Sequence, residues 1–322
     1  MPYIEESNYR APSFLYKNPH FSTIYIGRFK KTKSPNYQRK RLELSDGDFI
    51  DIDFILKNPD RAVVLCHGLE GASTRAYNNT SADFFLKNDF SVFAWNNRSC
   101  SGEMNRLPKL YHHGVVEDFK EMIDFVLGQG FQEVCLLGFS MGGAQIMNYL
   151  GTMKIDPRVK AAVSVSTPIQ LKSSAESLKK GFNRVYLKNF TRKISKKLKS
   201  KSEQFPDLLD WSQIQSIRTF DEIDEFFTAP LHGFTGREDY YERASPGFVM
   251  EEIKTPVLII NSLDDPFLGD TCYPIEFAKN HSFVYLETPL SGGHCAFPMK
   301  NSNHSYSEIR ALEFFRMVNR KP

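Results

Sequence analysis

A single serine lies between glycines in the segment Gly138-Phe139-Ser140-Met141-Gly142. This segment matches the pattern G-x-S-x-G, in which a sharp turn from a strand into a helix exposes a serine hydroxyl as a nucleophile. An apolar run at 133–138 predicts the strand, and the residues from Met141 onward predict the helix. Glycines beside the serine leave room for the tight turn. The alternative is a glycine-rich turn whose serine only caps the helix.

A serine hydroxyl is a poor nucleophile until a base removes its proton, and the base needs an acid to orient it. His294, in the segment SGGHCAF, follows one predicted strand, and Asp264 and Asp265, in LIINSLDDPF, follow the strand before it. Catalytic loops lie at the carboxyl ends of parallel strands. The order serine, acid, histidine also accompanies this serine motif. A common pattern places a small residue after the strand, then two further residues and then the catalytic aspartate. Ser262 fits the small residue, so this pattern favours Asp265 as the acid, and Asp264 remains the alternative.

Histidines that compete with His294 for the role of base either precede the acid in the chain or lie outside the expected catalytic loops. They are His67, His112, His113, His232 and His304. His294 is therefore the favoured base.

The segment HGLEG, residues 67–71, directly follows the first central strand. A loop at this place is suited to stabilising the negative oxygen that forms when a serine attacks a carbonyl group. We expect the backbone amides of Leu69 and Met141 to be the donors of this oxyanion hole. His67 is expected to brace the loop by hydrogen bonding and not to act as a base.

Short apolar runs alternate with helical patterns along most of the chain. The runs predict strands at 62–68, 91–96, 133–140, 161–168, 256–262 and 283–288, with helices at about 74–88, 115–128, 141–152, 271–280 and 306–319. Two alternating stretches around Asp46-Gly47 predict an antiparallel hairpin ahead of them. The fold class expected is α/β, with a mostly parallel central sheet and an antiparallel N-terminal hairpin.

Residues 169–250 separate two predicted strands by far more chain than an ordinary connection needs. We expect one domain over residues 1–322, with 169–250 as a helical lid or cap inserted in it. Between 172 and 201 there are eleven Lys or Arg residues and one acid. Apolar residues recur there every four positions, at Leu178, Phe182, Tyr186, Phe190, Ile194 and Leu198. A lid helix that buries this stripe over the site is favoured, and a basic amphipathic helix on an anionic membrane is the alternative.

Composition sets limits on the function. The chain has 322 residues and a formal net charge of +3, too weak a charge to indicate nucleic-acid binding. Its five cysteines include no C-x-x-C pair, its first residues do not form a signal-peptide pattern, and no apolar run reaches the roughly 20 residues of a membrane span. We expect a cytoplasmic protein, with peripheral contact to an anionic membrane as the alternative. No metal or organic cofactor is expected.

Several motifs together resemble the YheT-like branch of the α/β-hydrolases. They are RLELSDGDFIDID (41–53), CHGLEG (66–71), NNRSCSGEMNRLPKLYHHG (96–114), GFSMGG (138–143), KKGFNRVY (179–186), HGFTGREDYY (232–241), LDDPF (263–267) and GGHCAF (292–297). The resemblance implies a Ser140–Asp265–His294 triad that hydrolyses carboxylic esters through an acyl-enzyme, with short, medium or lipid-like acyl chains. The alternative on the same triad is an acyltransferase, which the resemblance also implies, or a thioesterase. A non-catalytic binding protein on this scaffold is the remaining alternative.

One loop departs from the pattern of that branch. Ser99 stands after Arg98 where the branch usually has glycine. Arg98 and Arg106 in this loop are suited either to binding an acidic substrate group or to bracing the loop, and bracing is favoured.

Overall fold

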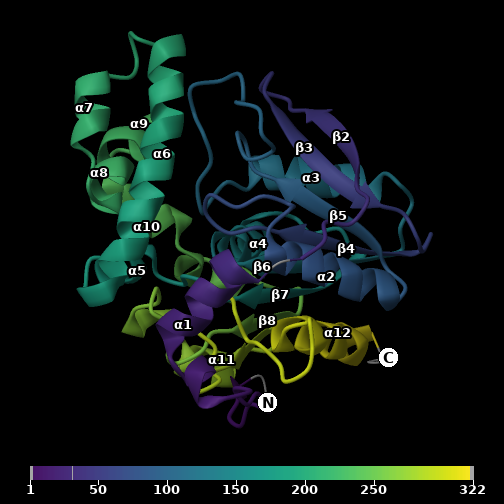
Figure 1. Ribbon diagram of the computed structural model, residues 1–322. Helices are drawn as coiled ribbons and strands as arrows, with labels where there is room; N and C mark the ends of the chain where they lie inside the picture. Colours follow the sequence, from purple (N-terminus) through teal and green to yellow (C-terminus); the bar gives the residue numbers. More distant parts are fainter. Residues whose placement is uncertain (1–2, 31, 320–322) are drawn as a thin grey trace.

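The computed structural model describes residues 3–30 and 32–319. Within these residues the centre of the molecule is a nine-stranded sheet in the order β1-β9-β8-β7-β6-β4-β5-β3-β2 (Figure 1). The strands are β1 (Tyr3–Ile4), β2 (Gln38–Glu43), β3 (Phe49–Ile55), β4 (Arg61–Cys66), β5 (Ser91–Asn96), β6 (Glu133–Phe139), β7 (Val159–Val165), β8 (Val257–Ile260) and β9 (Val284–Glu287). Strand β3 pairs antiparallel with β2 and β5, and the other pairs are parallel. The predicted fold class and the predicted hairpin are confirmed. The short edge strand β1 is not among the predicted strands.

Helices cover both faces of this sheet. They are α2 (Ala76–Lys87), α3 (Glu117–Leu127), α4 (Met141–Thr152), α11 (Ile275–Asn280) and α12 (Tyr306–Asn319). Successive side chains of a strand point to opposite faces. Val64 accordingly belongs to the core beneath α3, α4 and α11, and its neighbour Val63 belongs to the core beneath α2 and α12. This explains why the central strands are apolar on both faces. The helix predicted at about 271–280 is shorter in the structure, because the chain first makes the turn η7 (Asp270–Cys272) and α11 begins only at Ile275.

Between β7 and β8 the chain forms a helical insertion, residues 166–256. Its elements are α5 (Leu171–Leu178), η3 (Gly181–Asn183), α6 (Arg184–Gln204), α7 (Trp211–Ser216), α8 (Phe220–Ile223), η4 (Asp224–Thr228), α9 (Ala229–Leu231), α10 (Arg237–Ala244), η5 (Pro246–Phe248) and η6 (Met250–Glu252). The insertion has apolar clusters of its own, one of which contains Leu198, Ile214 and Phe227. Figure 1 shows α6, α7 and α8 together beside the sheet, at the upper left.

The apolar stripe predicted at residues 178–198 does not lie on one continuous helix. Leu178 ends α5 and Phe182 lies in η3, because Gly181 between them has a φ of 47°, in the left-handed region that ends a helix. The remaining stripe residues lie on α6, where Ile194 and Leu198 are buried. Phe182 is half exposed. The stripe therefore faces the interior except at its start.

A short helical segment precedes β2 and is not predicted by the sequence patterns. It consists of η1 (Phe14–Lys17), α1 (Pro19–Ile24) and η2 (Tyr25–Phe29). Asn18 caps α1 by accepting a hydrogen bond from Phe21 N–H, and Pro19 takes the first helical position, where its missing N–H costs nothing. None of the helices in the described ranges combines the length and the apolar character needed to cross a membrane.

Candidate active site

Ser140 lies at the turn between β6 and α4. Its φ is 54°, a strained value for a residue with a side chain, and such strain is typical of functional sites. A Cβ atom on Gly138 would lie 2.5 Å from Gly142 O, and one on Gly142 would lie 2.4 Å from Cys66 O. Only glycine fits at these two positions. The Ser140 side chain makes no capping hydrogen bond within the described residues, so the simple helix-cap interpretation does not describe this turn.

His294 pairs with Asp265. The imidazole Nδ1 lies 3.0 Å from each carboxylate oxygen of Asp265, whose side chain is fully buried. With Nδ1 donating to a carboxylate, Nε2 is left as the acceptor. Burial by itself would lower the pKa of His294, but the Asp265 carboxylate reverses this effect and raises the pKa above its ordinary value. The neighbouring Asp264 instead accepts a hydrogen bond from Gly293 N–H at 3.0 Å. The geometry thus distinguishes the two aspartates.

The histidine loop is held by residues distant in the sequence. His294 N–H donates to Thr23 Oγ1 at 2.9 Å, so α1 fixes the backbone of this loop. The Phe267 ring packs on the imidazole with centroids 4.1 Å apart, and Tyr186 of α6 packs on Phe267 at 4.8 Å. Sequence reasoning missed Thr23 and Phe267, and no motif around Thr23 could have indicated its partner.

Leu69 carries an amide that is free to bind a ligand. The amides on either side of it are engaged, because Gly68 N–H donates to the Tyr77 hydroxyl and Glu70 N–H donates to the Tyr111 hydroxyl, each at 3.0 Å. In residues 3–30 and 32–319 the N–H of Leu69 has no acceptor. The chain around Leu69 is therefore fixed while its own donor stays available.

The second amide belongs to Met141, the first residue of α4. Backbone N–H groups in the first turn of a helix have no partner within the helix and attract negative charge. Leu69, Met141, Ser140 and His294 all line one cavity. In the described part of the chain the hydrogen bonds of the His294 ring go to Asp265, and none joins the ring to the Ser140 hydroxyl. Catalytic hydrogen bonds are often long before substrate binds.

His67 is a structural histidine. It is fully buried, its Nδ1 lies 2.7 Å from Gly68 O, and its Nε2 accepts a hydrogen bond from Asn97 N–H at 3.1 Å. Nδ1 therefore carries the proton. Burial lowers the pKa of His67 to about 4, so the ring is neutral at pH 7. These contacts match the bracing role expected for this side chain.

Over the described ranges the other competing histidines do not pair with the acid, although His112, His113 and His232 line the same cavity as Ser140. The rings of His112 and His232 meet at 4.4 Å in the cavity wall, and His113 Nδ1 lies 3.0 Å from the Tyr240 hydroxyl. Burial lowers the pKa of His113 to about 4 and that of His232 to about 3. His304 lies at the start of α12, beside acidic side chains. Among the described residues none of these histidines pairs with Asp265.

The cavity that contains Ser140 is mostly apolar. The helical insertion supplies much of its wall, including Leu178, Phe190, Ile194, Leu198, Ile223 and Phe227. The inward face of the stripe on α6 is thus part of the cavity lining. No group of three or more His, Cys, Asp or Glu side chains in residues 3–30 and 32–319 is arranged to hold a metal ion.

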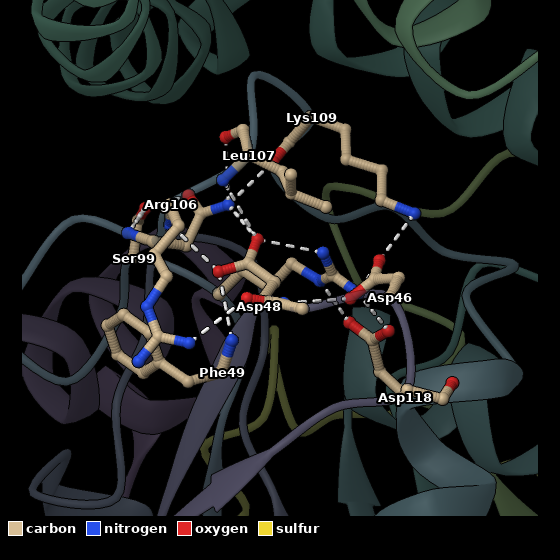
Figure 2. Close-up of polar contacts among 12 residues, drawn as sticks. Asp46, Asp48, Phe49, Ser99, Arg106, Leu107, Lys109 and Asp118 are labelled. Atoms are coloured by element: carbon tan, nitrogen blue, oxygen red, sulfur yellow. Dashed lines mark hydrogen bonds and ion pairs between the residues drawn. The ribbon is translucent and has the colours of Figure 1, made fainter.

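The loop after β5 is braced by arginine. Arg98 is 3% exposed and donates to Asp46 and Asp48 at 2.8 Å and to Asp118 at 2.6 Å. Figure 2 shows these three aspartates converging. Arg106 pairs with the exposed Glu43. Both arginines are engaged in bracing, and neither lines the cavity that contains Ser140.

Ser99 adopts the backbone conformation that glycine usually supplies. Its φ is 59°, in the left-handed region. The Ser99 hydroxyl donates to Asn105 Oδ1 at 2.5 Å and accepts from Asn105 N–H at 3.0 Å (Figure 2). This reciprocal pair offsets the cost of the positive φ, so the departure at Ser99 leaves the loop ordered.

Replacing Arg98 with methionine should lower the free energy of unfolding by about 3–5 kcal/mol, because it leaves buried carboxylates without their countercharge. Denaturant titration measures this change. Arg106→Met is the matched control, and it should have little effect because solvent screens the exposed Arg106–Glu43 pair. Equal losses from the two substitutions would contradict the structural role given to Arg98.

Comparison with known proteins identifies the family of this chain. Residues 61–300 match the family model described as alpha/beta hydrolase fold. The protein named "Putative esterase YheT" of Escherichia coli K12 is 31% identical over 290 residues, which cover 88% of this chain and 85% of that protein. "Phospholipase ABHD3" of Mus musculus is 28% identical over 282 residues, covering 84% and 68%. The structure of Pyrococcus furiosus esterase Pf2001 shares the fold, with a TM-score of 0.59 and 16% identity over 90% of this chain and 98% of that one. The chain therefore belongs to the α/β-hydrolase fold family, in its YheT-like branch of ester hydrolases.

Proposed function

We propose that this protein hydrolyses carboxylic esters through an acyl-enzyme formed on Ser140. The observation that carries the proposal is the convergence on one apolar cavity of a strained, partly exposed serine, the His294–Asp265 pair and two available backbone amides. Each group has the chemical character that two-step acyl transfer requires.

In the first step Ser140 Oγ attacks the ester carbonyl while His294 Nε2 takes the hydroxyl proton. Asp265 holds the imidazole in the tautomer that leaves Nε2 free and stabilises its positive charge. The amides of Leu69 and Met141 donate to the carbonyl oxygen as it becomes negative. His294 then returns the proton to the alkoxide that leaves, and the alcohol departs.

In the second step water attacks the acyl-enzyme. His294 takes a proton from this water, the carbonyl oxygen again becomes negative beside the amides of Leu69 and Met141, and collapse of the intermediate releases the acid and restores the Ser140 hydroxyl. The helical insertion acts as a lid in this proposal. Its apolar residues favour an acyl chain without charge, and the esterase and phospholipase names of the relatives support a short, medium or lipid-like chain.

A chain-length series of p-nitrophenyl esters tests this function. Turnover of at least one ester by the wild-type protein supports it, and a flat, inactive series favours a binding protein on this scaffold. Added alcohol separates hydrolysis from the alternative of acyl transfer, because a transferase forms new ester faster than free acid. A matched acyl thioester tests the thioesterase alternative in the same way.

Peripheral contact with an anionic membrane is part of the proposal, through the solvent-facing side of α6. Basic side chains recur along this exposed face, at Arg184, Lys188, Arg192, Lys196 and Lys199. Large apolar side chains are exposed nearby on η3 and the start of α6, at Phe182 (49%) and Val185 (57%). Positive charge beside exposed apolar groups suits the surface of an anionic bilayer. The cytoplasmic location stays a prediction.

Vesicle co-sedimentation should show stronger binding to phosphatidylcholine vesicles that contain phosphatidylglycerol than to phosphatidylcholine alone. Changing Lys188, Arg192 and Lys196 to glutamine should weaken this binding roughly 100-fold, since each basic residue near the surface contributes to attraction. Glutamine at Lys87, Lys120 and Lys279, on other helices, is the charge-matched control. Equal recovery with both kinds of vesicle would rule out the electrostatic contact.

A further inference from the structure

The helical insertion makes a charged contact with the loop that carries Leu69. Lys197 on α6 donates from Nζ to Glu70 Oε1 at 2.8 Å, and the Tyr111 hydroxyl donates to the same oxygen at 2.5 Å. The side chains of Lys197 and Glu70 are 16% and 6% exposed. Lys197 also lies 3.3 Å from Cys100 Sγ. Glu70 is therefore held on one side by the sheet domain and on the other by the insertion.

Glu70 lies in the same tight turn as Leu69. It is the third residue of a turn that Gly71 N–H closes by donating to Gly68 O at 2.9 Å. Its φ is 54°, a left-handed conformation that a residue with a side chain adopts only when its surroundings hold it. Leu69 is the second residue of this turn. The orientation of the Leu69 amide consequently depends on the turn that Glu70 completes.

The charges make this contact strong. Burial by itself would lower the pKa of Lys197, but Cys100 and Glu70 raise it above its ordinary value, so the ammonium group stays charged. Charge-assisted hydrogen bonds away from water are stronger than neutral ones. If α6 moved away, the Glu70 carboxylate would lose the ion-pair partner that it has among the described residues.

We propose that Lys197 and Glu70 are positioning residues through which α6 holds the oxyanion loop, residues 67–71, in its productive shape. The oxyanion site is then complete only while α6 is seated over the cavity, so the insertion controls the chemical step as well as access to the cavity. This inference rests on the proposed function of the Leu69 amide. Neither residue touches the reacting atoms in this mechanism.

A double-mutant cycle tests the proposal with Lys197→Met, Glu70→Gln and the double variant. Lys180→Met is the matched control, because Lys180 is an exposed lysine of the same insertion, just before η3. Each variant is measured for kcat and KM on the best p-nitrophenyl ester, for the rate of Ser140 modification by a fluorophosphonate and for thermal stability. The phosphonate rate reports the oxyanion site without depending on the choice of ester.

Each single variant should lower kcat about 10–100-fold with KM changed less than about threefold, because a loosened donor weakens binding of the transition state and leaves binding of substrate intact. The phosphonate rate should fall in parallel. The double variant should lose no more than the worse single variant, since both act through one contact. Lys180→Met should behave as wild type.

Two results would overturn the inference. In the first, the variants lose stability but keep kcat, which would make the contact purely structural. In the second, the two losses multiply in the double variant, which would show independent effects. Failure of the proposed function is distinguishable, because the wild-type protein would then neither turn over esters nor react with the phosphonate.

Discussion

Replacing Ser140 with alanine should lower kcat for p-nitrophenyl esters by about 10⁵–10⁶-fold, close to the full loss seen when the nucleophile of a triad is removed. The substitution takes away the atom that forms the acyl-enzyme and leaves His294 without a proton to accept. The amides of Leu69 and Met141 remain, so a residual rate above that in water is expected. Hydrolysis of the best ester in the chain-length series measures the change.

Covalent labelling gives an independent readout of the same serine. A fluorophosphonate should label the wild-type protein and leave the Ser140→Ala variant unlabelled. Ser81→Ala is the control for loss of a buried hydroxyl, because Ser81 lies on α2 and donates to Tyr77 O outside the cavity. Labelling that persists without Ser140 would place the nucleophile elsewhere, and a wild-type protein that resists labelling would favour the binding-protein alternative.

The glycine-flanked turn at Ser140 and the chain order of the triad residues could be predicted from the sequence. The glycines around Ser140 are needed because of contacts with residues close by in the fold, 2.4–2.5 Å from where a side chain would begin. The order of Ser140, the aspartates and His294 follows from the strands that precede them. Such features can be predicted because a parallel sheet brings the carboxyl ends of its strands to one edge.

The choice between Asp264 and Asp265 required the structure. The residues adjoin, so spacing separates them by a single position. Asp265 pairs with His294, whereas Asp264 accepts from Gly293 N–H in the same loop. Both carboxylates thus support the histidine loop, which explains why two consecutive acids occur there. The sequence motif alone does not show which aspartate pairs with the His294 ring and which accepts a hydrogen bond from the backbone.

Contacts between distant segments were beyond prediction. Thr23 lies 271 residues before His294, yet its hydroxyl accepts the hydrogen bond from His294 N–H. In the sequence Lys197 is one charge in a basic run, but in the fold its side chain is turned inward onto Glu70. A lysine in such a run gives no sign of its burial, because the tertiary packing of α6 decides which basic side chains face solvent.

Replacing Asp265 with asparagine should lower kcat by about 10⁴-fold and also change the pH dependence of the reaction. In the wild-type protein the carboxylate raises the pKa of His294 against the effect of burial. Only the neutral imidazole can accept the proton of Ser140. The value of kcat/KM should therefore rise with pH as His294 loses its proton.

Without the carboxylate, the largest influence that raises the pKa of His294 is lost, so burial shifts the balance toward the neutral ring. The rising limb of kcat/KM for Asp265→Asn should consequently move to lower pH, even though its plateau is far lower because the ring loses its orientation and preferred tautomer. A pH profile of both proteins measures the two effects together. Asp264→Asn is the matched control, with a much smaller loss and an unmoved limb. A limb that moves to higher pH in Asp265→Asn, or a larger loss in Asp264→Asn, would contradict the assignment of Asp265 as the acid that supports His294.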